Sequence, residues 1–312
     1  MRIKCLSPLL SGALLMLLLL TAGELMAEDT NDKDVDTDSE LSSDRQSIGL
    51  QGRPKWEFGV GGGFFEGFDY PGSIDSNRRQ FALPFFIYRS KRFRFGGGGV
   101  SAVSIEEPRW KLDWSVAASL NSSNQENSVR EGMEDLDFLL ELGPQIIWRA
   151  IDRVGAGGEE YRVDWSTKFR GVVSTDFGSV QGRGFVFETS VAGRIRNIAG
   201  FERVALLGGV SARLGSEGLN DYFYEVPDEF VTPNRPAFDA RAGLIDIRTT
   251  IGLAFNLPKR VRVFIAASTG FYEESANRTS PLHQALRTTS AALGIVWTIK
   301  QSQQRVGILD TQ

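Results

Sequence analysis

The sequence predicts an all-β fold, a transmembrane antiparallel β-barrel of twelve strands, with ten strands as the alternative. After residue 53, apolar and polar residues alternate along runs of nine to fourteen residues, which is the period of a β-strand. Strands of soluble sandwiches typically have about five to six residues, whereas a tilted strand that crosses a bilayer needs about 9 to 11. The N-terminus has the pattern of an export signal. Together these observations favour an outer-membrane barrel.

Residues 1–27 are predicted to form a secretory signal peptide. Arg2 and Lys4 precede an apolar stretch from Leu9 to Leu20, and cleavage is expected after Ala27. The apolar stretch is shorter than the roughly 20 residues that a spanning helix needs, so an uncleaved anchor is disfavoured. Residues 28–52 follow as an acidic leader. Eight acids and two bases lie between positions 28 and 45, a composition that predicts disorder.

The composition excludes several kinds of site. The single cysteine, Cys5, lies in the signal, so the exported chain has no thiol for disulfides, metal binding or catalysis. One histidine, His283, is too few for a histidine-rich metal site. Outside the signal and residues 28–45 the chain has 31 basic and 30 acidic residues, so its net charge there is close to zero. We expect no cofactor, no metal and no nucleic-acid partner.

Eleven runs follow the strand period. In the run 110–121, for example, Trp110, Leu112 and Trp114 share one face while Lys111 and Asp113 share the other. The runs are 56–65, 81–89, 92–105, 110–121, 136–149, 161–173, 184–196, 202–214, 245–257, 260–271 and 287–299. Because bacterial barrels have an even number of strands, GGGG at 96–99 is predicted to be a turn that divides 92–105 into two short strands.

The connections between these runs alternate in length. Long ones at 122–135, 174–182, 215–243 and 272–286 alternate with shorter ones at 106–109, 150–160, 197–201 and 258–259. Long loops outside and short turns in the periplasm are typical of outer-membrane barrels. The sequence thus predicts a barrel over 53–299, a polar tail over 300–312, and a location in the outer membrane of a Gram-negative bacterium.

The face opposite the apolar one carries charges of both signs, which suits a wet lumen better than a dry core. The predicted lumen-lining residues are Arg162, Lys168, Arg170, Glu188, Arg194, Arg196, Arg203, Arg260 and Arg262. They would select anionic solutes or pair with acids such as Glu141, Asp164 and Glu188. Pairing is the favoured interpretation.

The stretch WEFGVGGGFFEGFDYPGS at 56–73 is rich in glycine but lacks the lysine and hydroxyl residue of a phosphate-binding loop. With period two, Gly59, Gly61 and Gly63 face the lumen. There they would leave space for long arginines from neighbouring strands. Pro71-Gly72 then predicts a turn in the first external loop.

Several pieces of sequence resemble the MipA/OmpV family of outer-membrane proteins, and they occur in the family's order. The pieces are YPGS at 70–73, LPFFIYR at 83–89, MEDLDFLLELG at 133–143, DYFYEV at 221–226 and SPL at 280–282. The resemblance implies a non-enzymatic envelope protein that acts as a scaffold for a lytic murein transglycosylase and a bifunctional penicillin-binding protein. Adhesion or uptake of small solutes through a narrow channel is the alternative that it implies.

Loop residues in these pieces are the candidate interaction residues: Tyr70, Pro71, Gly72, Tyr222, Phe223, Tyr224, Ser280, Pro281 and Leu282. The aromatic cluster at 222–224 either contacts a partner or a sugar, or has a structural role, in which it folds inward to plug the barrel or lies in the lipid interface. The structural role is favoured. Ser280 with His283 could form part of a hydrolase triad, but a third residue and its geometry are required. Glu134, Asp135 and Asp137 could act as paired carboxylates. A solvated loop and a charged strand entrance are the favoured interpretations.

Overall fold

The structure, a computed structural model, describes residues 53–89, 93–95, 100–102, 105–119, 128–198 and 200–306. The predicted signal peptide, the acidic leader, the GGGG stretch and the last six residues lie outside the described residues.

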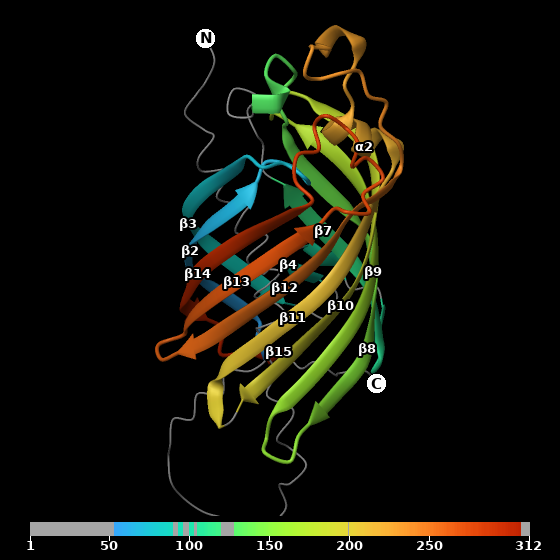
Figure 1. Ribbon diagram of the computed structural model, residues 1–312. Helices are drawn as coiled ribbons and strands as arrows, with labels where there is room; N and C mark the ends of the chain where they lie inside the picture. The colour runs from blue at the N-terminus through green and yellow to red at the C-terminus, as the bar shows by residue number, and fades with distance from the viewer. Residues whose placement is uncertain are drawn as a thin grey trace, which may run out of the picture.

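The described chain forms one curled antiparallel sheet (Figure 1). Its strand order is β5-β4-β3-β2-β14-β13-β12-β11-β10-β9-β8-β7-β6. The ten long strands are β2 (Trp56–Phe68), β3 (Ser76–Arg89), β7 (Trp110–Ser119), β8 (Phe138–Val154), β9 (Glu160–Thr175), β10 (Val180–Ile198), β11 (Phe201–Gly215), β12 (Gly243–Leu257), β13 (Val261–Phe271) and β14 (Arg287–Gln301). The short ones are β4 (Phe93–Phe95), β5 (Val100–Ala102) and β6 (Ile105–Glu106). The all-β prediction is confirmed, and each predicted run overlaps a strand or, at 92–105, three short strands.

The run at 92–105, which GGGG was predicted to divide into two short strands, is divided in the structure. Phe93 pairs with Ala102 and Phe95 with Val100, so β4 and β5 are antiparallel on either side of residues 96–99. β6 pairs with β7, and Cα atoms of β5 and β7 approach within 8 Å.

The sheet has a loop end and a turn end, and the connections of the ten long strands alternate between them. The turn end carries the connections before β4, β7, β9, β11 and β13, and the loop end carries those before β3, β8, β10, β12 and β14. A two-stranded sheet of β1 (Arg53–Pro54) and β15 (Arg305–Val306) lies beyond the turn-end limits of β2 and β14. The predicted polar tail therefore begins as ordered backbone, with residues 300–301 in β14 and 305–306 in β15.

The prediction of a long loop at 174–182 is wrong. β9 continues to Thr175 and β10 begins at Val180, which leaves a four-residue turn. The Asp176 carboxylate accepts hydrogen bonds from the backbone N–H groups of Gly178 (2.9 Å) and Ser179 (2.8 Å). This local side-chain turn replaces the loop that the polar residues had indicated.

The two faces of the sheet differ in chemistry as the alternation predicts. Trp148, Trp165 and Ile251 on the outer face are about half-exposed or more, whereas Arg170 and Asp246 on the inner face are buried. Trp110 pairs with Trp148, and Trp148 pairs with Trp165, so three adjacent strands carry a tryptophan row on the outer face near the turn end.

Glycines on the inner face make space for aromatic rings, not for the arginines that the sequence had suggested. A Cβ on Gly59 would lie 2.7 Å from the Phe85 ring, one on Gly63 3.2 Å from the Phe81 ring, and one on Gly294 2.0 Å from the Phe264 ring. Apolar residues of β3 supply those rings because they point inward, where Phe85 and Ile87 are buried. This sector of the inner wall is therefore apolar.

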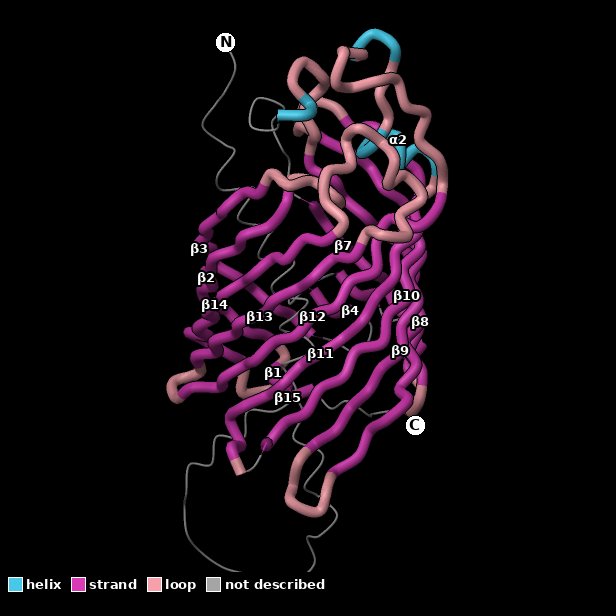
Figure 2. Tube along the Cα trace, in the orientation of Figure 1, coloured by secondary structure: helices cyan, strands magenta, loops and turns pink. Residues whose placement is uncertain are grey.

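Helices occur only in connections at the loop end of the described chain (Figure 2): η1 (Ser128–Arg130), α2 (Glu217–Tyr224) and η2 (Asp228–Phe230). No helix in the described part of the chain is long and apolar enough to cross a membrane.

Gly59→Ala should destabilise the fold by about 1–3 kcal/mol, the usual cost of overpacking. The added methyl group would lie 2.1 Å from the Trp297 carbonyl oxygen, which is backbone and cannot rotate away. Urea unfolding followed by circular dichroism measures the loss. Gly171→Ala is the matched control, because its nearest neighbour would be 3.8 Å away. Equal unfolding midpoints for the two variants would contradict the close approach.

Candidate functional site

Four connections meet at the loop end and form what we call the cap: residues 69–75, 128–137, 216–242 and 272–286. In Figure 1 the cap lies over the side of the sheet that β8 to β13 form. Four of the five sequence pieces that carry the family resemblance contribute to it. Residues far apart in the chain are therefore brought together at one site.

Hydrogen bonds between side chains and backbone join the pieces of the cap. The Tyr70 hydroxyl donates to the Leu282 carbonyl at 2.6 Å, and the Tyr224 hydroxyl donates to the Pro71 carbonyl at 3.0 Å. The Ser280 hydroxyl donates to the Tyr224 carbonyl at 2.7 Å. The YPGS, DYFYEV and SPL segments thus hold one another in a closed set of contacts.

An apolar cluster lies beneath these hydrogen bonds. Its buried members are Tyr70, Leu136, Leu139, Val172, Val186, Leu219, Phe223, Tyr224, Ala240 and Ile245. Strands β8, β9, β10 and β12 provide part of the set, and the loops provide the rest. The cap is therefore packed onto the inner wall of the sheet. Burial of these apolar side chains stabilises the cap and the sheet together.

Helix α2 directs three of these side chains inward. Leu219, Phe223 and Tyr224 are buried on one face, at the i, i+4 and i+5 spacing of a helix, while Glu217 is exposed. Ser216 precedes the helix, but its hydroxyl accepts a hydrogen bond from the Phe185 N–H of β10 at 2.9 Å. That contact anchors the start of the helix to the sheet.

Two buried arginines connect the outer loops of the cap. Arg235 donates to the carbonyl oxygens of Val129 (2.7 Å), Glu131 (3.0 Å) and Phe230 (2.7 Å). Arg130 donates to the Phe223 carbonyl at 3.3 Å and lies 5.7 Å from the centre of the Tyr70 ring. Guanidinium groups suit this role because they offer five donors in a fixed geometry.

The candidate interaction residues all lie in the cap, and most are covered. Tyr70, Gly72, Phe223, Tyr224, Ser280 and Leu282 are buried, whereas Pro71, Tyr222 and Pro281 are partly buried. The Tyr222 hydroxyl donates to the Asp137 carbonyl at 3.3 Å, and Arg183 lies 4.3 Å from the ring centre. Burial beside Asp137 raises the pKa of Tyr222 to about 12. In this conformation these residues pack within the protein, and a partner-binding role for them stays a prediction.

Ser280 and His283 are not arranged as nucleophile and base. The Ser280 hydroxyl bonds the Tyr224 carbonyl and accepts the Leu282 N–H, and within the described residues no hydrogen bond joins it to the imidazole. Of the carboxylates weighed for catalysis, Glu134 and Asp135 are exposed and Asp137 is half-buried. Burial and the nearby Asp176 raise the pKa of Asp137.

His283 occupies an apolar, aromatic environment. Its ring centre lies 5.8 Å from that of Tyr224 and 5.7 Å from that of Tyr272, edge-on in the second case. Gly72, with φ of 83°, leaves room for the ring, since a Cβ there would lie 2.7 Å from Nε2. Nε2 is buried without a hydrogen-bond partner in the described structure. Burial therefore lowers the pKa of His283, which disfavours the charged form.

Below the cap, charges of alternating sign cross five neighbouring strands on the inner face. In strand order this charge row is Glu141, Arg170, Glu188, Arg213 and Asp246, from β8 to β12. Arg170 bonds Glu141 at 2.8 Å and Glu188 at 2.7 Å, and Arg213 bonds Asp246 at 2.7 Å. Each acid thus has an adjacent base, which offsets the cost of burying the charges. Arg213 and Asp246 belong to the row although the sequence reasoning did not single them out.

Of the other predicted lumen residues, Lys168 contacts the row and the rest lie nearer the turn end. Lys168 bonds Glu188 at 2.7 Å, Arg162 bonds Asp164 at 2.8 Å, and Arg262 lies 3.6 Å from Glu57. Arg194 and Arg196 are buried. Arg203 and Arg260 are exposed, and Arg260 belongs to the turn before β13, not to the strand. The described contacts are mostly ion pairs; a solute-selecting role stays a prediction.

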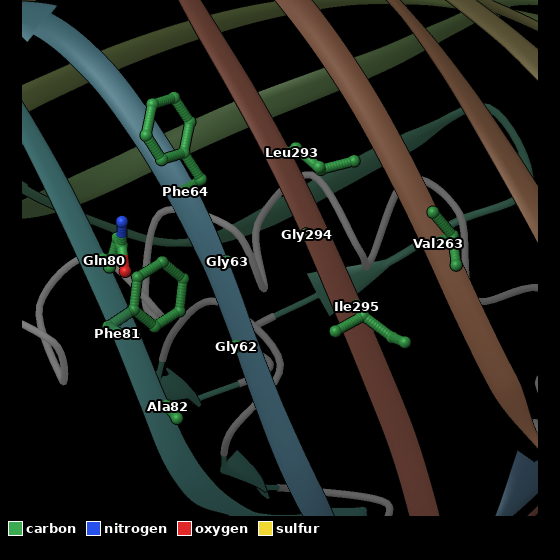
Figure 3. Close-up of a pocket in the computed structure, with 10 residues that line it drawn as sticks. All are labelled: Gly62, Gly63, Phe64, Gln80, Phe81, Ala82, Val263, Leu293, Gly294 and Ile295. Atoms are coloured by element: carbon green, nitrogen blue, oxygen red, sulfur yellow. The ribbon is translucent and has the colours of Figure 1, made fainter.

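The outer face has one open apolar hollow of about 700 Å³, between β3, β2, β14 and β13 (Figure 3). The hollow lies beside Gly62, because this residue has no side chain to fill the space between its outward-facing neighbours, such as Phe64 and Ile295. The hollow contains no ionisable group among its lining residues.

Comparison with known proteins places these features in a family. The family described as MltA-interacting protein MipA matches residues 59–299. No curated protein matches the chain. Among solved structures, the NanC porin is 10% identical, with a TM-score of 0.38, and the match covers 78% of this chain and 100% of the porin. Outer membrane phospholipase A from Escherichia coli is 12% identical, with a TM-score of 0.27 and coverage of 79% and 94%.

Tyr70→Phe should loosen the cap, because it leaves the buried Leu282 carbonyl without its donor. Such a loss costs about 1–3 kcal/mol. Hydrogen exchange measured by mass spectrometry should show faster exchange in residues 272–286 and little change in β12 and β13. Tyr161→Phe is the control, since the described structure shows no hydrogen bond from that hydroxyl. Unchanged exchange in Tyr70→Phe would show that the contact does not hold the cap.

In Asp221→Asn the cap should weaken as pH falls from about 7.5 to 5.5. The folded-state pKa of His283 lies below its usual value, so below pH about 6.5 the opened state binds a proton that the closed cap resists. Asp221 acts in the opposite direction, because partial burial and the neighbouring Glu225 raise its pKa to about 6. Protection factors of residues 272–286, which correct for the slower intrinsic amide exchange in acid, should therefore fall with acid in Asp221→Asn. They should not fall in Asp221→Asn/His283→Phe, where the raised pKa of Asp137 favours the closed cap in acid, and a fall in that double variant would contradict the assignment.

Proposed function

The chain belongs to the MltA-interacting protein MipA family, and we propose on this basis that it is an outer-membrane β-barrel acting as a scaffold for peptidoglycan-remodelling enzymes. The family match carries the proposal, because it spans nearly all of the strand region. The expected partners are a lytic murein transglycosylase and a bifunctional penicillin-binding protein. The proposed role is non-enzymatic.

The outer face supports insertion in a membrane. The long strands have 10 to 19 residues, against the roughly 9 to 11 that a tilted span needs. Outward side chains such as Leu142, Ile251 and Ile295 are half-exposed and apolar. The tryptophan row of β7, β8 and β9 then corresponds to an interfacial aromatic girdle.

We propose a closed barrel of twelve strands. Ten are the long strands, β4 is the eleventh, and β5 with β6 forms the twelfth beside β7. The antiparallel β4–β5 pair, the β6–β7 pairing and the approach of β5 to β7 support this count. An even number places residues 53 and 306 at the same end, which we assign to the periplasm, with the cap outside.

A narrow channel for small solutes is the alternative function. The charged sector of the inner face favours it, since charged walls select ions. Against it stand the ion pairs that neutralise the row and the inward rings of Phe81, Phe85 and Phe264.

Two measurements on the purified mature chain test the proposal. On affinity capture from detergent-solubilised envelopes, the lytic transglycosylase should be enriched over a control capture with an unrelated outer-membrane barrel. Equal amounts in both captures would remove support for the scaffold role. In planar bilayers we expect no discrete conductance steps, and reproducible, salt-dependent steps would favour the channel.

A further inference from the structure

We propose that the turn end of the sheet binds the chain's own acidic leader, residues 28–45, through a rim of exposed cations. The basic rim consists of Arg109, Arg203, Lys259, Arg260 and Lys300. The inference is independent of the partner enzymes suggested above. It concerns an interaction surface and the segment that occupies it.

The rim carries positive charge that the described structure leaves uncompensated. All five side chains are exposed, and none forms an ion pair with a described residue. They lie in the β6–β7 and β12–β13 turns, at the start of β11 and at the end of β14. Because five unpaired cations share one end, they produce a positive field there.

Acids at the same end do not neutralise the rim, since most of them already have a cation. Asp152 pairs with Arg149 at 3.5 Å and Glu160 with Arg196 at 3.5 Å. Lys111 pairs with Asp113. Of the described acids at the turn end, Glu107 is exposed and forms no ion pair with a described residue, against the five cations of the rim.

The acidic leader is complementary in charge to the basic rim, and the strand that follows it, β1, lies at the same end of the sheet as the rim. Residues 28–45 contain eight acids and two bases, a net charge of −6. The chain leaves the structure at Arg53, whose strand β1 pairs with β15 at the turn end. Seven residues separate positions 45 and 53, and the eight Cα–Cα steps between them reach at most about 28 Å. A short tether of this kind gives an effective concentration in the millimolar range.

The loop end would repel the leader. Among the described residues there, nine acids are exposed against four cations. The acids are Glu131, Glu134, Asp135, Asp176, Glu217, Asp228, Glu229, Asp239 and Glu274, and the cations are Arg78, Arg241, Arg278 and Arg287. The two ends therefore have opposite surface charge, and Coulomb attraction directs the leader to the end where it is tethered. Any acidic partner of the turn end must displace the leader first, so the leader lowers the apparent affinity of the turn end for such a partner.

Distances between spin labels in the full mature chain in non-ionic detergent test the proposal. One label is placed in the leader by Ser39→Cys and the second at an exposed turn by Ala156→Cys. Removal of the signal takes away Cys5, so no other thiol interferes. The distance distribution should be narrow at about 0.05 M NaCl and should broaden about twofold at about 0.5 M, as screening predicts.

Charge variants separate docking from a passive tether. The variant Arg203→Gln/Lys259→Gln/Arg260→Gln should give the broad distribution already at low salt. The control Arg78→Gln/Arg241→Gln/Arg278→Gln removes the same charge from the loop end and should keep the narrow one. The variant Asp34→Asn/Asp36→Asn/Asp38→Asn changes only the leader and should also broaden the distance distribution. Because it leaves the sheet unchanged, it provides the test if the rim variant does not fold. A distribution that is broad and insensitive to salt in the unmodified chain would overturn the proposal.

Discussion

Strands β2 and β14, the first and last of the long strands, share an antiparallel ladder that runs from Glu66 and Ala291 to Glu57 and Gln301, and the positions of all loops depend on it. Consecutive strands are antiparallel, so successive connections alternate between the two ends of the sheet, and this ladder brings the first and last long strands side by side. The close approach of β2 to its neighbours in turn requires glycine where Phe81 and Phe85 cross its inner face. The glycine-rich stretch that resembles a nucleotide loop is therefore a condition for forming the sheet.

In the cap, residues of the sequence pieces that carry the family resemblance pack within the protein and so have a structural role, whether or not they also contact a partner. Tyr70, Tyr224 and Leu282 are almost fully buried and hydrogen-bonded to one another's segments. A substitution there would first disturb packing, so a loss of function from it would not identify a contact surface. Surfaces available to partners are the exposed parts of the cap and the turn end.

The period-two pattern was enough to locate the strands, because the alternation of exposed tryptophans and inward charges is a local property of each run. The same alternation predicts that Arg162 and Arg170 of β9 and Arg194 and Arg196 of β10 face inward. The cap was not predictable in the same way, since Tyr70, Tyr224 and Ser280 meet through tertiary contacts that no spacing records. The short turn at 176–179 was missed for a different reason: one aspartate closes it, and its polar neighbours had suggested a longer loop.

The pairing of Arg53–Pro54 with Arg305–Val306 has a consequence for assembly. The residue from which the leader departs acquires its backbone partners only when the last strand is in place. Until then the leader has no defined point of departure and cannot be aimed at any one surface. Pairing of the last strand is thus a precondition for the concentration of acidic charge that we propose at the turn end, and a docked leader would report that folding is finished.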